Sequence, residues 1–182
     1  MPKRPGPNAG PTTREAVLAA ARRLFTDRGY DGTSMRDIAA EVGLTTAALY
    51  YHFPAKDAIL AALAQPHRDE IDALVAWSRA QENHPGLLRE TALRWVESAG
   101  QDRLDGLRLA RAVHPALAGD GALTALTALV DDFADPADPV DRLQVRLLFE
   151  AFTCAALAAA PDDDLATIVA TARWMVLAMT AG

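Results

Sequence analysis

Four side chains able to donate hydrogen bonds lie close together in the segment LYYHFPAK, residues 49–56. A helix buried in a core rarely carries Tyr50, Tyr51 and His52 in succession, although isolated tyrosines usually pack on neighbouring helices. Phenol, imidazole and the ammonium group of Lys56 are all donors to phosphate oxygens. The predicted chemistry of this segment is therefore contact with a phosphate backbone outside the chain.

The charge of the chain is unevenly distributed, in a way that agrees with such a contact. The net charge of −6 argues at first against a polyanionic partner. Residues 1–62, however, hold eight basic and six acidic side chains, whereas the remaining residues hold ten basic and eighteen acidic ones. A mildly basic head followed by an acidic body indicates that the head, and not the body, meets a polyanion.

The elements around the segment have the layout of a helix-turn-helix. Apolar residues recur at helical spacing, and small polar residues and glycines mark the ends of the helices. In this motif the second helix enters the major groove of DNA. The predicted boundaries are Thr12 or Thr13 and Gly29 for the first helix, Thr33 or Ser34 and Gly43 for the second, Thr45 and Pro54 for the third, and Lys56 for the start of the fourth.

The segment AARRLFTDRGYDGTSMRDIAAEVGLTTAALYYHFPAKDAIL, residues 20–60, resembles the DNA-binding head of the tetracycline-repressor (TetR) family. The resemblance covers about a third of the chain, and LYYHFPAKDAIL is its most specific part. It implies that Arg36 reaches a base edge or a phosphate, and that Thr46, Ala47 and Tyr50 lie near bases. The positions that it implies for phosphate contact or capping are Thr33, Thr45, Tyr51, His52 and Lys56.

Two positions depart from the family pattern. Residue 47 is Ala where many members have Gly, and residue 46 is Thr where a longer polar or basic side chain is common. A short Thr46 and an apolar Ala47 leave few groups for direct base readout. Arg36, Tyr50 and contacts with thymine methyl groups are then expected to carry more of it.

The rest of the chain is predicted to be helical, so the expected fold is all-α: a three-helix head followed by a larger helical body. Residues 1–11 are expected to form a flexible arm, 12–62 the DNA-binding domain and 63–182 the ligand-binding and dimerisation domain. Pro66 either kinks or ends the fourth helix, and the pattern leaves both open. Further helices are predicted over 67–81, 86–99, 103–114, 120–134, 138–160 and 162–180.

The roles expected for the body follow from the resemblance to the TetR family. In the family, central helices enclose a ligand cavity, and the last two helices of each subunit form a four-helix dimer interface. Ordinary core packing is the alternative for the same apolar residues. The expected ligand-binding residues are Trp77, Trp95, Leu107, Arg108, Arg111, His114 and Phe152. The expected interface residues are Leu143, Leu147, Ala156, Ile168, Ala172, Met175 and Met179.

Other site chemistry is not expected. His67, His84 and His114 match no compact metal-ligand spacing, and no nucleophile elbow or glycine-rich phosphate loop occurs, so we expect neither a metal, a cofactor nor an enzyme. Cys154 is the only cysteine, which excludes an intrachain disulfide. No apolar run is long enough to span a membrane.

The function expected from these features is a cytoplasmic transcriptional regulator that binds a palindromic operator as a homodimer, most simply a repressor released by a small molecule. An activator is the alternative within the same class, and a constitutive repressor is expected if the body has no ligand. A helical small-molecule-binding protein or enzyme with a non-functional head is the alternative from another class. A protein–protein adaptor is a third, and it would show no preference among duplexes.

Overall fold

A computed structural model of the chain describes residues 12–112, 121–160 and 162–181, without the side chains of 110–112 and 121–125. All ten elements in these ranges are α-helices, so the predicted all-helical fold is confirmed for the described part of the chain. Residues 12–65 form one compact unit, and residues 66–110, 121–160 and 162–181 belong to a second. Among the described helices, none is both long and apolar enough to cross a membrane.

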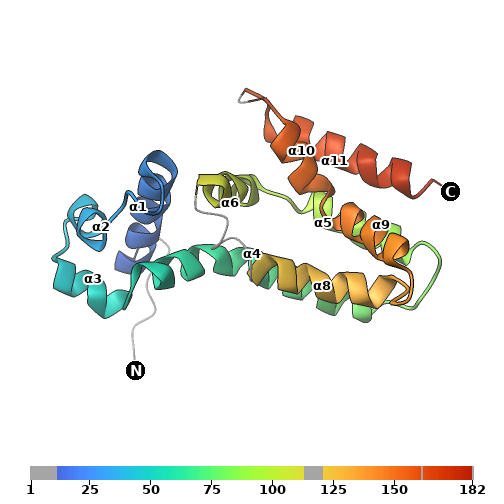
Figure 1. Ribbon diagram of the computed structural model, residues 1–182, viewed down its shortest axis with the longest axis horizontal. Coiled ribbons are helices and arrows are strands. Elements are labelled where there is room, and N and C mark those ends of the chain that lie inside the picture. The colour runs from blue at the N-terminus through green and yellow to red at the C-terminus, as the bar shows by residue number, and fades with distance from the viewer. Residues whose placement is uncertain (1–11, 113–120, 161, 182) are drawn as a thin grey trace. The chain divides into compact units, whose positions relative to one another are not determined.

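The first unit is built from three short helices and the beginning of a long one, α4, which continues into the second unit (Figure 1). Helix α1 packs against α2, and α2 against α3. Apolar side chains of all three helices meet in a small core, with Phe25 of α1, Ile38 of α2 and Leu49 of α3 fully buried. The bounds of these elements are Thr13–Arg28 for α1, Met35–Glu41 for α2, Thr46–His52 for α3 and Lys56–Arg79 for α4.

The helices of the first unit begin at capping residues that the sequence marks. Thr12 caps α1, and its hydroxyl accepts a hydrogen bond from the Glu15 amide while the Glu15 carboxylate accepts one from the Thr12 amide. Ser34 and Asp37 form the same reciprocal pair at the start of α2. Such a capping box satisfies donors that a helix leaves unpaired at its start. The hydrogen bonds from Ser34 also hold the pKa of Asp37 below its ordinary value.

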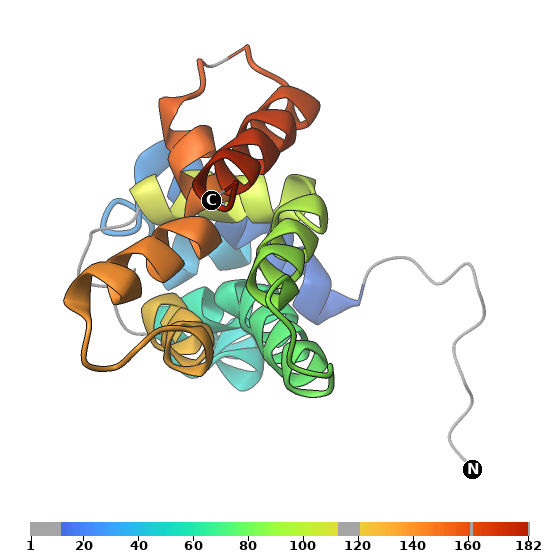
Figure 2. The same cartoon turned by 90° about the vertical axis from the view of Figure 1, so that its right-hand side faces the viewer.

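The second unit contains the rest of α4 and six further described helices (Figure 2). Helix α11 packs against α10, α5 and α9, and α9 also contacts α8 and α5. The core of this unit is apolar, and within it the Trp95 indole N–H donates to the carbonyl of Phe149 at 3.0 Å. The bounds are Leu87–Glu97 for α5, Gln101–Ala112 for α6, Gly121–Phe133 for α8, Pro139–Phe149 for α9, Ala151–Ala158 for α10 and Leu165–Met179 for α11.

The structure decides the open alternative at Pro66 and shows that one other predicted boundary is wrong. Helix α4 runs through Pro66 without ending, so no separate helix starts at residue 67. The predicted single helix over 138–160 is divided at Glu150, whose ψ of 0° departs from helical geometry, into α9 and α10. The Cys154 amide still donates to the Glu150 carbonyl at 2.8 Å, so the division is a change of direction within a nearly continuous helical path.

Candidate nucleic-acid interface

The turn between α2 and α3 fixes how α3 is presented. The Leu44 amide donates to the Ala39 carbonyl at 2.9 Å and the Gly43 amide to the Ala40 carbonyl at 3.2 Å, which is the Schellman pattern. Gly43 has a φ of 68°, a conformation that side chains other than glycine rarely adopt. Thr45 then caps α3 by accepting a hydrogen bond from the Ala48 amide.

Helix α3 has one buried side and one exposed side. Leu49 and the capping residue Phe53 are buried in the core of the first unit. On the other side Ala47 is exposed, Tyr50 is 50% exposed and Tyr51 is 88% exposed. A tyrosine exposed to this extent gains little from packing, so its hydroxyl is available to an external acceptor. The placement agrees with the sequence-based expectation that these residues face a partner.

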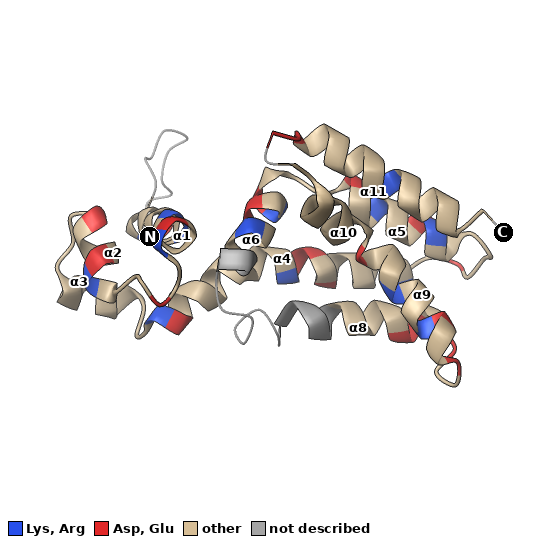
Figure 3. Cartoon of the chain, turned by 45° about the horizontal axis from the view of Figure 1, so that its top comes forward, with Lys and Arg blue, Asp and Glu red and all other residues tan. Residues whose placement is uncertain are grey.

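Three further expected contact residues lie beside this surface. Thr46 and His52 are half-buried, and the His52 ring lies edge-on to Tyr51 with 5.5 Å between the ring centroids. Arg36 is exposed on α2. Helix α3 itself carries no lysine, arginine, aspartate or glutamate (Figure 3). The charges of the described head lie on α1, the turn that follows it, α2 and the start of α4. The exposed side of α3 therefore offers uncharged donors.

Lys56 has a more internal role than phosphate contact alone. Its ammonium group donates to the carbonyl of Tyr30 at 2.6 Å and to that of Thr33 at 2.9 Å. It also lies 3.9 Å from the centroid of the Tyr30 ring. Two of its three N–H donors are thus committed to the turn between α1 and α2, and one is left for a phosphate. We refer to Lys56, Tyr30 and the two carbonyls as the lysine clamp.

Tyr30 joins the same arrangement from its other end. Its hydroxyl donates to the Asp57 carboxylate, and its ring packs on Phe25 with 5.2 Å between centroids. Burial and the hydrogen bond to Asp57 raise the pKa of Tyr30 well above its ordinary value, so the phenol stays protonated. Tyr30 and Asp57 position the site, and sequence reasoning missed both. The signal available was an aromatic residue in a polar turn followed by adjacent opposite charges at 56 and 57.

Thr33 is corrected from a phosphate-contacting to an internal residue. It is 1% exposed, and its hydroxyl lies 2.9 Å from the Gly29 carbonyl and 3.1 Å from that of Leu24. A hydroxyl committed to buried carbonyls cannot reach a phosphate. Arg14 was also missed: its guanidinium lies 4.5 Å from the centroid of the Phe53 ring and covers the end of α3.

The residues expected to bind a ligand do not line one cavity. Trp95 and Phe152 are buried in the core, Leu107 is half-buried, and Arg108 is exposed and pairs with Asp105 at 3.6 Å. Arg111 and His114 lie outside the residues whose side chains are described. Trp77 does line a surface pocket, and the other residues of that pocket are Glu90, Leu93, Arg94, Glu97 and Ser98.

The residues expected at a dimer interface fall into two groups. Ile168 and Ala172 are buried within the chain's own core, so they present no surface to a second copy. Leu143, Leu147 and Met179 are exposed, and Ala156 and Met175 are half-buried. Other large apolar side chains exposed on the same helices, which sequence reasoning did not select, are Val140, Leu157, Trp174 and Leu177.

No metal site accompanies these surfaces in the described residues, where no group of three or more His, Cys, Asp or Glu side chains is placed to hold an ion. Residues 17–63, which include α2, α3 and the lysine clamp, match the family model described as bacterial regulatory proteins, tetR family. The matched segment is the compact helix-turn-helix unit just described, and it defines the chain as a protein with a DNA-binding type of head. The match covers 47 of the chain's 182 residues, so the similarity to the tetR family is shown for the head.

Relatives with assigned roles match part of the chain. It is 31% identical over 71 residues to the "Biofilm operon icaADBC HTH-type negative transcriptional regulator IcaR" of Staphylococcus aureus (strain Newman). The match covers 39% of this chain and 38% of that protein. The match therefore spans well under half of the length of either protein.

Solved structures extend the likeness to nearly the whole chain. Mycobacterium smegmatis AmtR is 26% identical, with a TM-score of 0.54, covering 100% of this chain and 96% of that one. The ketosteroid transcriptional regulator KstR2 of Mycobacterium tuberculosis has a TM-score of 0.65 at 18% identity, covering 96% of each chain. At this identity the second likeness shows the fold alone. The helical body is thus of the kind that other chains with this head carry.

Proposed function

We propose that this protein is a sequence-specific DNA-binding transcriptional regulator, and that it represses transcription by occupying a palindromic operator as a homodimer. The observation that carries the proposal is the exposed side of α3, where Tyr50 and Tyr51 project from a helix whose other side is buried in the head. The repressor sign is supported by a relative whose name describes a negative transcriptional regulator. Action on operator DNA would require the protein to be in the cytoplasm.

Some of the proposed contacts would position the head on the DNA, and the others would read the base sequence. Tyr51, His52 and the third donor of Lys56 would bind phosphates and set the register of the head on the duplex. Tyr50 and Arg36 would reach base edges, and the methyl groups of Thr46 and Ala47 would contact thymine methyl groups. In a dimer, two such helices about 34–36 Å apart would enter successive major grooves on one face of the duplex.

Dimerisation is supported by apolar side chains that one copy of the chain leaves uncovered. Val140, Leu143 and Leu147 recur at helical spacing on α9, and Leu143 is 62% exposed. On α11, Trp174 is 67% exposed and Leu177 follows it three residues later. Contiguous exposed apolar surface of this kind marks an interaction site, and a second copy presents the same two helices.

Release of the operator by a small molecule would require that the ligand bind two states of the dimer with different affinity, one of which fits the operator. Helix α4 supports a connection between the two units, because it begins with the lysine clamp at Lys56 and reaches Trp77 in the body.

The test is enrichment of bound sequences from a random duplex pool, followed by fluorescence anisotropy on the enriched site. We expect a palindrome, and we expect Tyr50→Ala and Arg36→Ala each to weaken binding at least tenfold. Arg23→Ala removes the same charge from the same unit but from an exposed pair with Glu41, so it serves as the matched control. No enriched sequence, or an equal loss for Arg23→Ala and Arg36→Ala, would contradict the proposed surface.

The dimer is tested separately by sedimentation velocity. Leu143→Glu adds a carboxylate to the exposed side of α9 and is expected to shift the protein to monomer. Ala76→Glu adds the same group to an exposed position of α4 and is expected to leave the dimer intact. A dimer that survives Leu143→Glu would place the interface elsewhere.

A further inference from the structure

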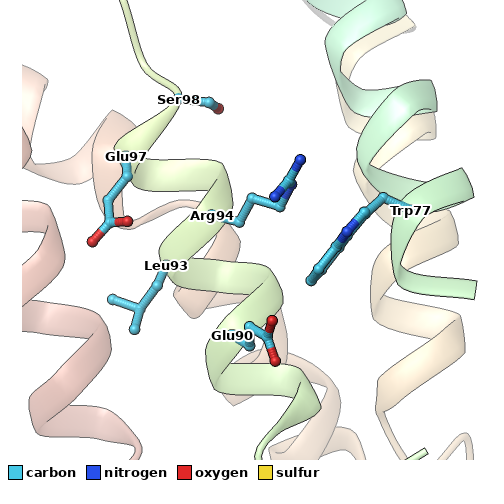
Figure 4. A pocket seen from close by; sticks show the side chains of 6 residues that line it. All are labelled: Trp77, Glu90, Leu93, Arg94, Glu97 and Ser98. Atoms are coloured by element: carbon cyan, nitrogen blue, oxygen red, sulfur yellow. The ribbon is translucent and has the colours of Figure 1, made fainter. Parts of the chain in front are cut away.

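A surface pocket of about 510 Å³ lies in the second unit, where one side of α5 faces Trp77 of α4. Four of its residues, Glu90, Arg94, Glu97 and Ser98, recur at helical spacing on α5. In Figure 4 the Trp77 indole extends toward α5, and the Arg94 side chain extends toward the indole from the opposite wall. All six residues that line the pocket belong to the second unit.

A cation already lies on the aromatic wall of this pocket. The Arg94 guanidinium is 4.6 Å from the centroid of the Trp77 ring, within the range of a cation–π contact. Arg94 is exposed, and it forms no ion pair with any described residue. Its guanidinium can therefore move into water at little cost, and the indole surface then becomes free for another planar cation.

The carboxylates of the pocket favour the same type of ligand. Glu90 and Glu97 outnumber the single cation Arg94. Arg173 of α11 pairs with Glu97 at 3.0 Å, whereas the nearest charge partner of Glu90 is the imidazole of His84 at 3.6 Å. Glu90 is thus the carboxylate available to an incoming positive charge, and an anionic ligand would meet repulsion from both acids.

We propose that this pocket binds a planar aromatic cation, which stacks on Trp77 in place of Arg94 with its positive charge toward Glu90. An indole surface with a nearby carboxylate is suited to a delocalised cation, because the ring attracts the charge and the flat ligand covers the apolar ring. Leu93 adds apolar surface to the wall. That such a ligand acts as the effector rests on the function proposed above.

The wall of the pocket is connected to the buried part of the body through Ser98. The Ser98 hydroxyl accepts a hydrogen bond from the Arg103 guanidinium at 3.1 Å. Arg103, whose side chain is 3% exposed, also donates to the Glu70 carboxylate at 2.7 Å and to the Trp95 carbonyl at 2.6 Å. One guanidinium thus joins α6 to α5 and to α4, and α4 is the helix that continues into the head.

Occupation of the pocket would therefore act on α6 and α4 through Ser98. A ligand that packs against Ser98 displaces its side chain, which weakens the hydrogen bond that the hydroxyl accepts from Arg103 and loosens the contact of Arg103 on α6 with Glu70. The expected consequence is a change in hydrogen-exchange protection of α6, and Ser98→Ala should abolish that change without abolishing binding.

The test uses the DNA-free full-length protein, N-methylquinolinium as the planar cation and quinoline as its uncharged analogue at pH 7.5. Isothermal titration calorimetry should show at least fivefold tighter binding of the cation. Trp77→Ala should weaken cation binding at least tenfold, Trp77→Phe less, and Glu90→Gln about threefold. Glu82→Gln, which changes an exposed carboxylate outside the pocket, is the matched control for Glu90→Gln and should leave the dissociation constant unchanged, with circular dichroism confirming that each variant is folded.

Equal binding of the cation and quinoline would overturn the proposed ligand class, and full binding by Trp77→Ala would overturn the site. Cation binding that leaves the exchange of α6 unchanged would overturn the connection through Ser98. Because no DNA is present, these outcomes are independent of whether an operator is found, and a failure of the regulator proposal is recognised separately by the absence of an enriched duplex.

Discussion

Replacing Lys56 with methionine separates two roles that the structure gives to this side chain. Methionine keeps the length of the aliphatic stem but has no donor for the carbonyls of Tyr30 and Thr33. We expect the turn between α1 and α2 to open more often, and operator affinity to fall as a consequence of this opening as well as of a lost phosphate contact.

The magnitude follows from two hydrogen bonds donated by a charged group. Each such bond is worth about 1.5–3 kcal/mol, and the lower end applies to Lys56 because it is only half-buried. Loss of the contact with the Tyr30 ring adds about 0.5 kcal/mol. The local stability of the turn should thus fall by about 3.5 kcal/mol, which is about a 400-fold increase in the open population.

The assay is hydrogen exchange of a peptide that covers residues 29–38, measured by mass spectrometry, together with operator affinity. Arg36→Met is the matched control, since Arg36 is exposed in the same unit and makes no contact with the turn. It should lower affinity and leave exchange unchanged. If Lys56→Met lowers affinity while the exchange of this peptide stays at the wild-type rate, the lysine clamp does not stabilise the turn and the argument is refuted.

Four further predictions concern the body, the turn before α3 and the charge of the head. Arg103→Ala should lower the free energy of unfolding by about 3–5 kcal/mol, because Glu70 and the Trp95 carbonyl lose their buried partner. Arg103→Met keeps a side chain beside Trp95 and should lower it by only about 1–2 kcal/mol. Urea titrations followed by tryptophan fluorescence measure both values. Burial, and then the charge of Arg103, lower the pKa of His67 below 6.5, so the folded state binds fewer protons than the unfolded chain. The free energy of unfolding should therefore be constant above pH 6.5 and fall as the pH drops below it. His67→Gln should reduce this fall. Gly43→Ala should cost about 1–2 kcal/mol through its φ of 68°, since an added Cβ would meet no atom within 4 Å, and thermal unfolding of the variant measures the cost. A plot of the logarithm of the operator binding constant against the logarithm of the salt concentration should have a slope of only about −4 to −7, because each head offers few cations. A slope near about −10 would show contacts beyond those proposed.

Local signals predicted the head well because its geometry is set by nearby residues. Thr12, Ser34 and Thr45 are followed by residues that complete their caps, and Gly43 supplies the conformation that the turn needs. The same reasoning failed for Thr33. A threonine beside a helix start is equally suited to cap the helix or to bond upstream carbonyls, and only the packing of α1 against α2 decides between them.

Longer-range features could not be read from spacing. Proline removes one helical hydrogen bond, but whether α4 ends at Pro66 depends on what supports the helix on either side. The burial of Ile168 and Ala172 depends on which side of α11 meets α10 and α5, and both sides of this helix carry apolar residues. The pocket beside Trp77 needs α4 and α5 to be adjacent, a relation that no local pattern encodes.

The balance of charge in the head explains why so many of its ionic groups act internally. Residues 12–65 hold six basic and six acidic side chains, so the described head has no net charge to attract DNA. Lys56 holds the turn, Arg14 covers Phe53 and Arg23 pairs with Glu41. When long-range attraction is weak, affinity depends on uncharged donors such as Tyr50 and Tyr51 meeting their acceptors together. Such donors are effective only on a rigid support, and the charged groups of this head supply that rigidity.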